Sequence, residues 1–228
     1  MAGWFQWKKT FSLSSMMVKQ IKVGFMDVFC YIVWCEETHR GVIIDPGGDE
    51  ERIIDTVRSL GLTIESVVNT HGHPDHTCGN RKIREFTGAK IYMHALDDQF
   101  FNTDEGKSMA RQMGLAPSPP ADVLLHDGDA IHFGRQKLIA LHTPGHTPGG
   151  ICLYGENNLF TGDTLFVGAI GRTDLPGGSL EILLQSIKEK ILCLPDNTII
   201  WPGHNYGSSP TSTLGLEKIH NPYITDFC

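Results

Sequence analysis

The chain has 228 residues and a formal net charge of −7, with 40% hydrophobic and 20% charged residues. This length fits one domain, because a single hydrophobic core stops growing only beyond about 250 to 300 residues. The composition is close to globular averages and excludes an extensively disordered chain. The excess of acidic residues repels a phosphate backbone, and no run of Lys and Arg offsets it. We therefore expect no nucleic-acid partner.

Neither a membrane span nor a disulfide scaffold is expected. No stretch approaches the ~20 apolar residues that cross a bilayer. The six cysteines are scattered without close pairs, which is typical of reduced thiols in a cytoplasmic protein. Residues 1–17 include Lys8 and Lys9, but their apolar run is too short for a signal peptide. We interpret them as a disordered leader before a domain that spans residues 18–228.

Short apolar runs set the pattern of the first half of the chain. Three of them are rich in β-branched and aromatic residues and favour a meander of strands, which Asp45-Pro46-Gly47-Gly48 ends with turn chemistry. Apolar residues at helical spacing then predict a helix that stops at Gly61. The predicted elements are strands at 18–23, 28–34, 41–44 and 64–69 and a helix at 53–60. The last strand leads into the segment 70–76, which we expect to be a loop.

The remaining elements begin with a helix at 80–86 and a strand at 90–94. A connection at 100–120 follows, which is long enough to be functional. A second set of strands is predicted at 123–125, 130–133, 136–141, 151–154 and 158–161, with a helix at 180–191 and a last strand at 198–201. Two halves of strands followed by helices predict an α+β fold in which two sheets pack together and helices lie outside.

The predicted loop is dense in groups that bind metal ions. It contains His71, His73, Asp75 and His76 within six consecutive residues. A zinc-type ion takes imidazole nitrogen and carboxylate oxygen at about 2.0 to 2.2 Å. The alternating His71 and His73 can point two imidazoles at one ion. The adjacent Asp75 and His76, turned by Pro74, can point at a second.

Three further candidates share one local context, a strand end that leads into a Gly- or Pro-rich turn. They are His146, Asp163 and His204. Together with the loop they make seven ligands, enough for two divalent metal ions with Asp163 shared between them. A shared carboxylate holds two ions near the ~3.5 to 4 Å at which they can clamp one substrate oxygen. We expect zinc first, with iron or manganese as alternatives.

The order His71-x-His73-x-Asp75-His76, then His146, Asp163 and His204, resembles the metallo-β-lactamase superfamily, and within it hydrolases similar to glyoxalase II. The match runs from Val18 to about Tyr206 and includes Asp45-Pro-Gly-Gly48, Phe160-Thr-Gly-Asp-Thr-Leu-Phe166 and Gly171-Arg-Thr-Asp174. The resemblance implies an αββα sandwich, with two mixed β-sheets flanked by helices.

The resemblance also implies how the ligands are divided between two metal ions and which reaction the ions support. One ion is expected on His71, His73 and His146, the other on Asp75, His76 and His204, with Asp163 bridging. In this family a metal-bound hydroxide attacks a thioester carbonyl of the hydroxyacylglutathione type, and the thiolate leaves. Metal binding can lower the pKa of water to about 7. Asp75 is a ligand first, and second a group that can orient the hydroxide and accept its proton.

The sequence departs from the family pattern at positions that are expected to bind the substrate. Little follows His204, where glyoxalase II has a helical region that helps to hold glutathione. Tyr206 matches the family tyrosine, and Arg172 stands where the family has a lysine. The guanidinium of Arg172 suits either a substrate carboxylate or a pair with Asp174. We expect a small-molecule thioester as substrate, with a choice that is relaxed or different from that of glyoxalase II.

Two other functions compete with this interpretation. A persulfide dioxygenase-like enzyme uses the same fold with one iron, here on His71, His146 and Asp163. A non-catalytic metal-binding module is the second, although structural zinc sites are usually closed by four ligands.

Asp45 is interpreted as a residue that orients its loop, not as a ligand. No membrane partner is expected, and the chain is either a monomer or a homodimer.

Overall fold

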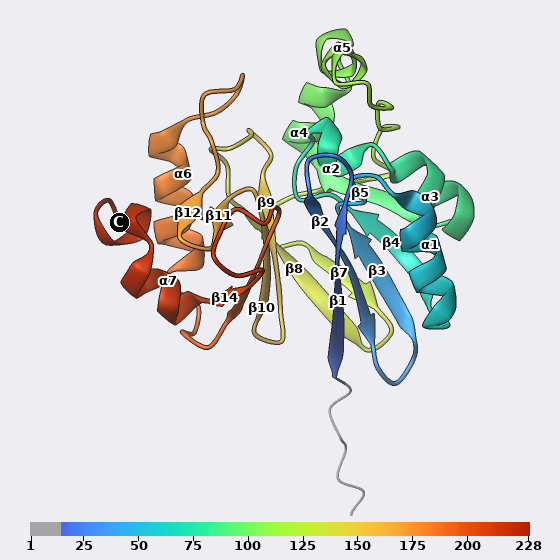
Figure 1. The fold of residues 1–228 in the computed structure, drawn as a ribbon, viewed down its shortest axis with the longest axis horizontal. Coiled ribbons are helices and arrows are strands. Elements are labelled where there is room, and N and C mark those ends of the chain that lie inside the picture. Colours follow the sequence, from blue (N-terminus) through green and yellow to red (C-terminus); the bar gives the residue numbers. More distant parts are fainter. Residues whose placement is uncertain (1–14) are drawn as a thin grey trace, which may run out of the picture.

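The computed structural model describes residues 15–228. Two six-stranded β-sheets pack face to face, and helices cover the outer face of each sheet (Figure 1). This arrangement confirms the αββα sandwich. The predicted leader lies outside the described residues except for its last three. Two of these, Met16 and Met17, pair with Cys35 and Trp34 in the first strand, which therefore begins two residues earlier than expected.

The first sheet is built from the first half of the chain. Its strands follow one another in chain order: β1 (Met16–Val23), β2 (Val28–Cys35), β3 (Arg40–Ile44), β4 (Thr63–Val68), β5 (Lys90–His94) and β6 (Val123–Leu125). The first three form the predicted antiparallel meander, and the later pairs are parallel, so the sheet is mixed. The helices of this half are α1 (Glu50–Ser59), α2 (Pro74–Thr77), α3 (Asn80–Thr87), α4 (Ala95–Phe101) and α5 (Asp104–Gln112).

The second sheet has the order β14-β13-β10-β9-β8-β7. Its strands are β7 (Ala130–Phe133), β8 (Gln136–His142), β9 (Ile151–Gly155), β10 (Asn158–Gly162), β13 (Ile199–Pro202) and β14 (Ser212–Thr213). A separate hairpin consists of β11 (Leu165–Phe166) and β12 (Ala169–Ile170). The helices are α6 (Leu180–Ser186), which continues as the π-helix η1 (Ile187–Ile191), α7 (Leu214–His220) and α8 (Pro222–Thr225).

Three apolar layers hold the sandwich together. The central layer lies between the two sheets, and the outer layers lie between each sheet and its helices. In the centre the ring of Tyr31 packs edge-on against Phe160, with ring centroids 5.1 Å apart, and against Trp201 at 5.8 Å. The Tyr31 hydroxyl donates a hydrogen bond of 2.5 Å to the carbonyl oxygen of Pro202. One side chain of β2 therefore ties the first sheet to a strand of the second.

Two expectations from the sequence are wrong. Residues 123–125 belong to the first sheet, because β6 pairs in parallel with β5. A strand of only three residues has no pattern that assigns it to one sheet or the other. The chain reaches β6 from β5 by a crossover through α4 and α5, which permits the parallel pairing. Residues 74–77 are not loop but one turn of helix, which begins with Pro74 at a position where proline fits a helix.

The C-terminal helices support the small hairpin. Glu217 on α7 accepts a hydrogen bond of 2.8 Å from the backbone N–H of Gly168, and the amide of Asn221 donates to the carbonyl of Ala169 at 3.1 Å. Both polar side chains are buried. The hairpin that leads to Arg172 is thus fixed from the C-terminal end of the described chain.

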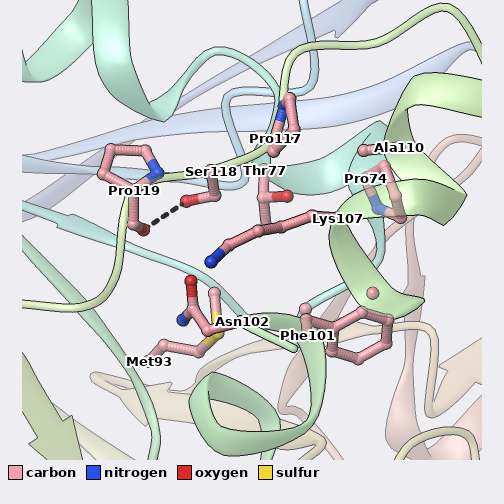
Figure 2. A pocket seen from close by; sticks show the side chains of 12 residues that line it. Pro74, Thr77, Met93, Phe101, Asn102, Lys107, Ala110, Pro117, Ser118 and Pro119 are labelled. Atoms are coloured by element: carbon pink, nitrogen blue, oxygen red, sulfur yellow. Dashed lines mark hydrogen bonds between the residues drawn. The ribbon is translucent and has the colours of Figure 1, made fainter. Parts of the chain in front are cut away.

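The long connection after β5 packs behind residues 72–77. A pocket between them is lined by Gly72, Pro74, Phe101 and Ser118, among others, and the side chain of Lys107 extends into it from α5 (Figure 2). The connection at 100–120 is therefore a support for the segment that carries the candidate ligands.

Two general features concern the whole described chain. All six cysteines are free thiols. Between residues 15 and 228, every helix is too short or too polar to traverse a bilayer.

Replacing Tyr31 with Phe tests the link between the sheets. The substitution removes the hydroxyl and leaves the Pro202 carbonyl without this donor, so we expect the free energy of unfolding to fall by about 1–3 kcal/mol. Urea denaturation measures this change. Tyr154→Phe is the control, since its hydroxyl makes only a long, exposed bond to Asn157. Equal stability of the two variants would contradict the role assigned to Tyr31.

Candidate metal centre

The candidate ligands come from strand ends that meet at one edge of the sandwich. His71 and His73 follow β4, while Asp163 follows β10 and His204 follows β13. Strands β10 and β13 are parallel neighbours, so their carboxyl ends lie side by side. His146 lies in the turn between β8 and β9. Side chains far apart in the sequence therefore converge because the strands that carry them end together.

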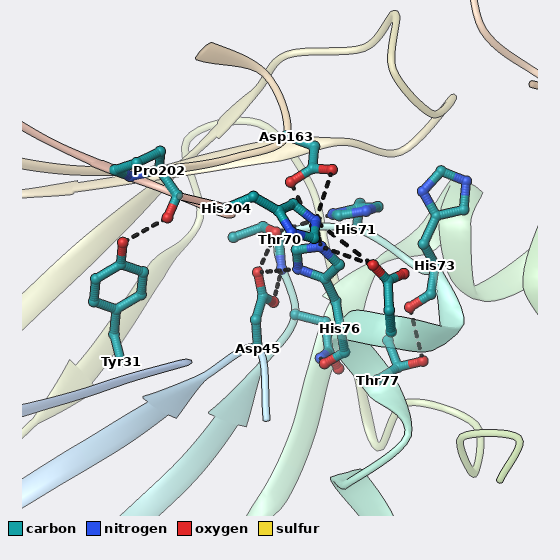
Figure 3. Close-up of polar contacts among 12 residues, drawn as sticks. Tyr31, Asp45, Thr70, His71, His73, His76, Thr77, Asp163, Pro202 and His204 are labelled. Atoms are coloured by element: carbon teal, nitrogen blue, oxygen red, sulfur yellow. Dashed lines mark hydrogen bonds and ion pairs between the residues drawn. The ribbon is translucent and has the colours of Figure 1, made fainter. Parts of the chain in front are cut away.

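Six of the seven predicted ligands form two adjoining groups. Figure 3 shows His71, His76 and His204 of these groups close to Asp163. Within each group the ligand atoms lie within 4.8 Å of one another; the first group is His71, His73 and His146, and the second is Asp75, His76 and His204. Nδ1 of His73 is 3.0 Å from Nε2 of His146. Nε2 of His76 is 3.1 Å from Nε2 of His204. The structure thus brings these six side chains together in two groups of three.

The Asp163 carboxylate lies between the two groups. One of its oxygens is 3.5 Å from Nε2 of His76, and the other is 3.5 Å from Nε2 of both His146 and His204. A single side chain therefore contacts both groups, which is the geometry required of a shared ligand.

Backbone carbonyls fix the orientation of two of the rings. Nδ1 of His146 donates to the carbonyl oxygen of Arg172 at 2.7 Å, and Nδ1 of His204 donates to that of Met26 at 3.1 Å. A carbonyl oxygen only accepts hydrogen bonds, so each Nδ1 carries the proton. The Nε2 lone pair of each ring is then directed at the centre, as a metal ligand requires.

Asp45 and Thr70 fix the rings of His71 and His76. Asp45 accepts from the backbone N–H and the hydroxyl of Thr70, at 2.8 and 2.5 Å, and faces Nδ1 of His76 at 3.0 Å. The Thr70 oxygen is 3.1 Å from Nδ1 of His71. Asp45 lies close enough to His71 and His76 to count as a third ligand group. Because its oxygens are already engaged, we interpret it as an orienting residue, in agreement with the sequence analysis.

Two polar atoms of the centre have no hydrogen-bond partner among residues 15–228. Nε2 of His71 and Oδ1 of Asp163 are buried and have no hydrogen-bond partner among the described residues. Leaving such an atom unpaired costs about 1–3 kcal/mol. Imidazole and carboxylate donors together match zinc, iron or manganese. The residues present therefore fit divalent metal ions.

Burial and charge determine which of these groups is protonated in the metal-free protein. Burial, and then the neighbouring His146, lowers the pKa of His73 to about 3. Burial also lowers the pKa of His71 well below its usual value. Burial acts in the same direction on His76, but the carboxylates of Asp163, Asp75 and Asp45 outweigh it and raise its pKa to about 10. His71 and His73 are thus held neutral, and His76 carries a positive charge beside these carboxylates.

The two candidate substrate residues lie at the surface beside the centre. The ring of Tyr206 stacks on His204, with centroids 4.7 Å apart and planes 3° from parallel, and is 61% exposed. The guanidinium of Arg172 makes two hydrogen bonds of 2.8 Å to the Asp174 carboxylate. Of the two roles considered for Arg172, this structure contains the pair with Asp174.

Other residues near the motif have structural contacts. His142 stacks on His94 with centroids 4.1 Å apart and faces the carbonyl of Pro148. Cys78 is buried, and burial followed by the charges of Glu50 and Asp75 raises the pKa of its thiol to about 12. Neither residue belongs to a ligand group in residues 15–228.

Sequence analysis missed Asp97 on α4. Its carboxylate is fully buried and contacts both segments that carry the first ligand group. The only signal in the sequence is an acidic residue in the first turn of a short helix, which is usually a solvated position. Nothing local indicates that this side chain points inward.

Comparison with known proteins agrees with this geometry. Residues 23–204 match the model of the metallo-beta-lactamase superfamily. The chain is 36% identical to the hydroxyacylglutathione hydrolase GloC of Haemophilus influenzae, over 92% of this chain and 98% of that protein. It is 34% identical to the mitochondrial persulfide dioxygenase ETHE1 of Bos taurus, over 88% of this chain and 72% of that protein.

A solved structure extends the comparison to metal content. The crystal structure of TTHA1623 in a di-iron-bound form has a TM-score of 0.78 and 35% sequence identity, covering 90% of this chain and all of that one. The chain therefore belongs to the metallo-β-lactamase superfamily. Its members are generally hydrolytic enzymes, and both hydrolase and dioxygenase relatives are found at similar identity.

Replacing Asp45 with Asn tests the support beneath the centre. The amide cannot accept all the hydrogen bonds that the carboxylate takes from Thr70 and His76, so we expect metal affinity to fall about 10- to 100-fold. Competition with a chromophoric chelator measures the affinity. Asp55→Asn is the control, because the Asp55 carboxylate is exposed and pairs only with Arg58 on the surface of α1. Wild-type affinity in the Asp45 variant would refute the orienting role.

Proposed function

We propose that the protein is a metal-dependent hydrolase that cleaves thioesters of the hydroxyacylglutathione type. The observation that carries the proposal is the pair of ligand groups that share the Asp163 carboxylate. A relative named hydroxyacylglutathione hydrolase, matched over nearly its whole length, supports this substrate class.

The proposed cofactors are two divalent metal ions, with zinc preferred over iron and manganese. His71, His73 and His146 would hold one ion, Asp75, His76 and His204 would hold the other, and Asp163 would bind both. Ions bound there supply a water that ionises near pH 7 and an electrophile that polarises the thioester carbonyl. The unpartnered atoms of His71 and Asp163 support this assignment.

Asp75 is the proposed catalytic residue of the chain. Its Oδ2 lies 3.5 Å from Nε2 of His204 and 3.7 Å from Nε2 of His76, so its carboxylate borders the second group. There it can orient the attacking water and accept a proton from it. The water oxygen bonds to the carbonyl carbon, the carbon–sulfur bond breaks, and the leaving thiolate takes the proton that Asp75 accepted.

Arg172 and Tyr206 are the proposed substrate-binding residues. Binding a substrate carboxylate requires Arg172 to leave Asp174, and an exposed ion pair of this kind contributes little to stability. Tyr206 offers an exposed aromatic ring next to His204. We expect a small-molecule thioester as partner, and neither nucleic acid nor a membrane. The protein is expected to act as a monomer or a homodimer. The six free thiols favour a cytoplasmic location.

The second candidate function is that of a persulfide dioxygenase-like enzyme. It would use one iron on His71, His146 and Asp163, and the identity to the bovine persulfide dioxygenase favours it. The hydrolase is favoured because the second group has all three of its metal-binding residues, Asp75, His76 and His204. Iron enzymes of this fold can, however, retain those residues. The number of ions bound and the consumption of oxygen separate the two.

Assays on protein of known metal content test the proposal. We expect two divalent ions per chain and hydrolysis of S-lactoylglutathione, at a lower rate than a full-length glyoxalase II shows. A panel of other acyl-thioesters and lactones defines the substrate range. One iron per chain with oxygen uptake in the presence of glutathione persulfide would establish the dioxygenase. Inactivity towards every thioester would also defeat the hydrolase proposal.

The ligand assignment has its own test. His73→Ala removes one imidazole of the first group, so we expect the rate of thioester hydrolysis to fall by roughly 100-fold or more, since activation of water is weakened. His126→Ala is the matched control because His126 is exposed and outside the ligand groups. Hydrolysis by the His73 variant at the wild-type rate would favour a non-catalytic metal-binding role.

Arg172→Ala tests the binding of a substrate carboxylate. We expect KM for a thioester with a free carboxylate to rise about 10-fold with kcat unchanged, because a charged hydrogen bond made equally in the ground and transition states is lost. The same thioester with its carboxylate esterified serves as the control substrate, and its KM should not change. Equal effects on both substrates would mean that the guanidinium serves only its pair with Asp174.

A further inference from the structure

Asp97 joins the two segments that carry the first ligand group. One oxygen of its carboxylate accepts from the backbone N–H of Gly72 and from the hydroxyl of Thr147, both at 2.8 Å. The other oxygen accepts from the backbone N–H of Gly149 at 2.5 Å. Asp97 is 0% exposed. A buried carboxylate with three such donors is a rigid connection, because charge-assisted bonds are stronger than neutral ones.

Glycines allow this close approach. A Cβ added to Gly149 would lie 2.5 Å from the backbone nitrogen of Asp97 and 2.9 Å from its Cβ. A Cβ added to Gly72 would lie 2.1 Å from the ring of Phe101, one turn further along α4. Helix α4 therefore packs closely on both ligand segments, with its backbone against Gly149 and the Phe101 ring against Gly72.

His73 depends on this support more than the other histidine ligands do. His71, His76, His146 and His204 each present Nδ1 to an oxygen outside the centre. Nδ1 of His73 faces His146, and its Nε2 contacts no hydrogen-bonding atom of residues 15–228. Its ring packs on Phe101, with centroids 5.2 Å apart. The position of His73 is thus set by its backbone, which Asp97 holds at Gly72, and by α4.

We propose that Asp97 is a positioning residue that selectively sets the affinity of the metal position formed by His71, His73 and His146. The position formed by Asp75, His76 and His204 does not depend on it, because Asp45 and the Met26 carbonyl hold those rings. The inference rests on the metal binding of the proposed function and not on its substrate.

Asp97→Asn is the principal variant. The amide cannot accept from all three donors, so the binding of zinc at the first position is expected to weaken about 10- to 100-fold. Asp98→Asn is the matched control, with the same change in the next residue of α4. Asp98 accepts from Ala121 and Asn102 at 2.7 Å each and bonds neither ligand segment. Chelator competition and elemental analysis give the affinity and the ion count.

Two backgrounds identify the position that is affected. His204→Ala removes a ligand of the second position and leaves all three ligands of the first position in place. In this background, adding Asp97→Asn is expected to weaken zinc binding by the same factor as in wild type. His73→Ala removes a ligand of the first position and leaves all three ligands of the second position in place. In this background, adding Asp97→Asn is expected to leave the zinc affinity unchanged. Equal weakening in both backgrounds, or wild-type affinity in the folded Asp97 variant, would overturn the proposal.

Thr147→Val covers the case in which the Asp97 variant does not fold. It removes one of the three donors, so we expect a several-fold loss of affinity at the first position only. Thr147→Ser keeps the hydroxyl and is expected to restore the affinity. Absence of this pattern would also overturn the proposal. Because zinc affinity requires no substrate, lack of thioester hydrolysis would defeat the proposed function and leave this inference standing.

Discussion

The placement of one buried carboxylate, that of Asp163, between two groups of histidines is the constraint on which the centre depends. Burial alone would raise the pKa of this carboxyl, but the charges and hydrogen bonds of His76 and His204 hold it well below the usual value. The residue is delivered by β10, and its neighbours by strands that end at the same edge. The sheet order of the second half is therefore what makes a shared ligand possible.

A second layer of acceptors surrounds the imidazoles and differs between the two groups. The second group is held by Asp45 and by the carbonyl of Met26 in the β1–β2 turn. The first is held by the carbonyl of Arg172 and, through the backbone, by Asp97. Elements from both halves of the chain contribute, so the complete centre requires the two halves to be packed together. Outer partners of this kind commonly tune ligand basicity and affinity.

Local patterns predicted an α+β fold of two packed sheets, which the structure confirms, and they singled out the seven candidate ligands. Four of these lie within six consecutive residues, and His146, Asp163 and His204 each follow a strand and lie in a Gly- or Pro-rich turn. Contacts between distant residues were not predictable in this way. Asp97 meets Gly72 and Thr147 across 25 and 50 positions, and no periodicity reports such a meeting. The sheet to which β6 belongs was mistaken for the same reason, since a three-residue strand is placed by its neighbours.

The buried contacts of α7 with the small hairpin connect the C-terminal helices to the candidate centre. Glu217 and Asn221 hold the hairpin that leads to Arg172, while the seven converging side chains precede α7 in the chain. The Arg172 carbonyl in turn accepts from the ring of His146, so a change in α7 that shifts the hairpin also shifts an acceptor of the first ligand group. Substitutions in this helix can therefore alter the inorganic chemistry of the protein although the helix contributes none of the seven candidate ligands.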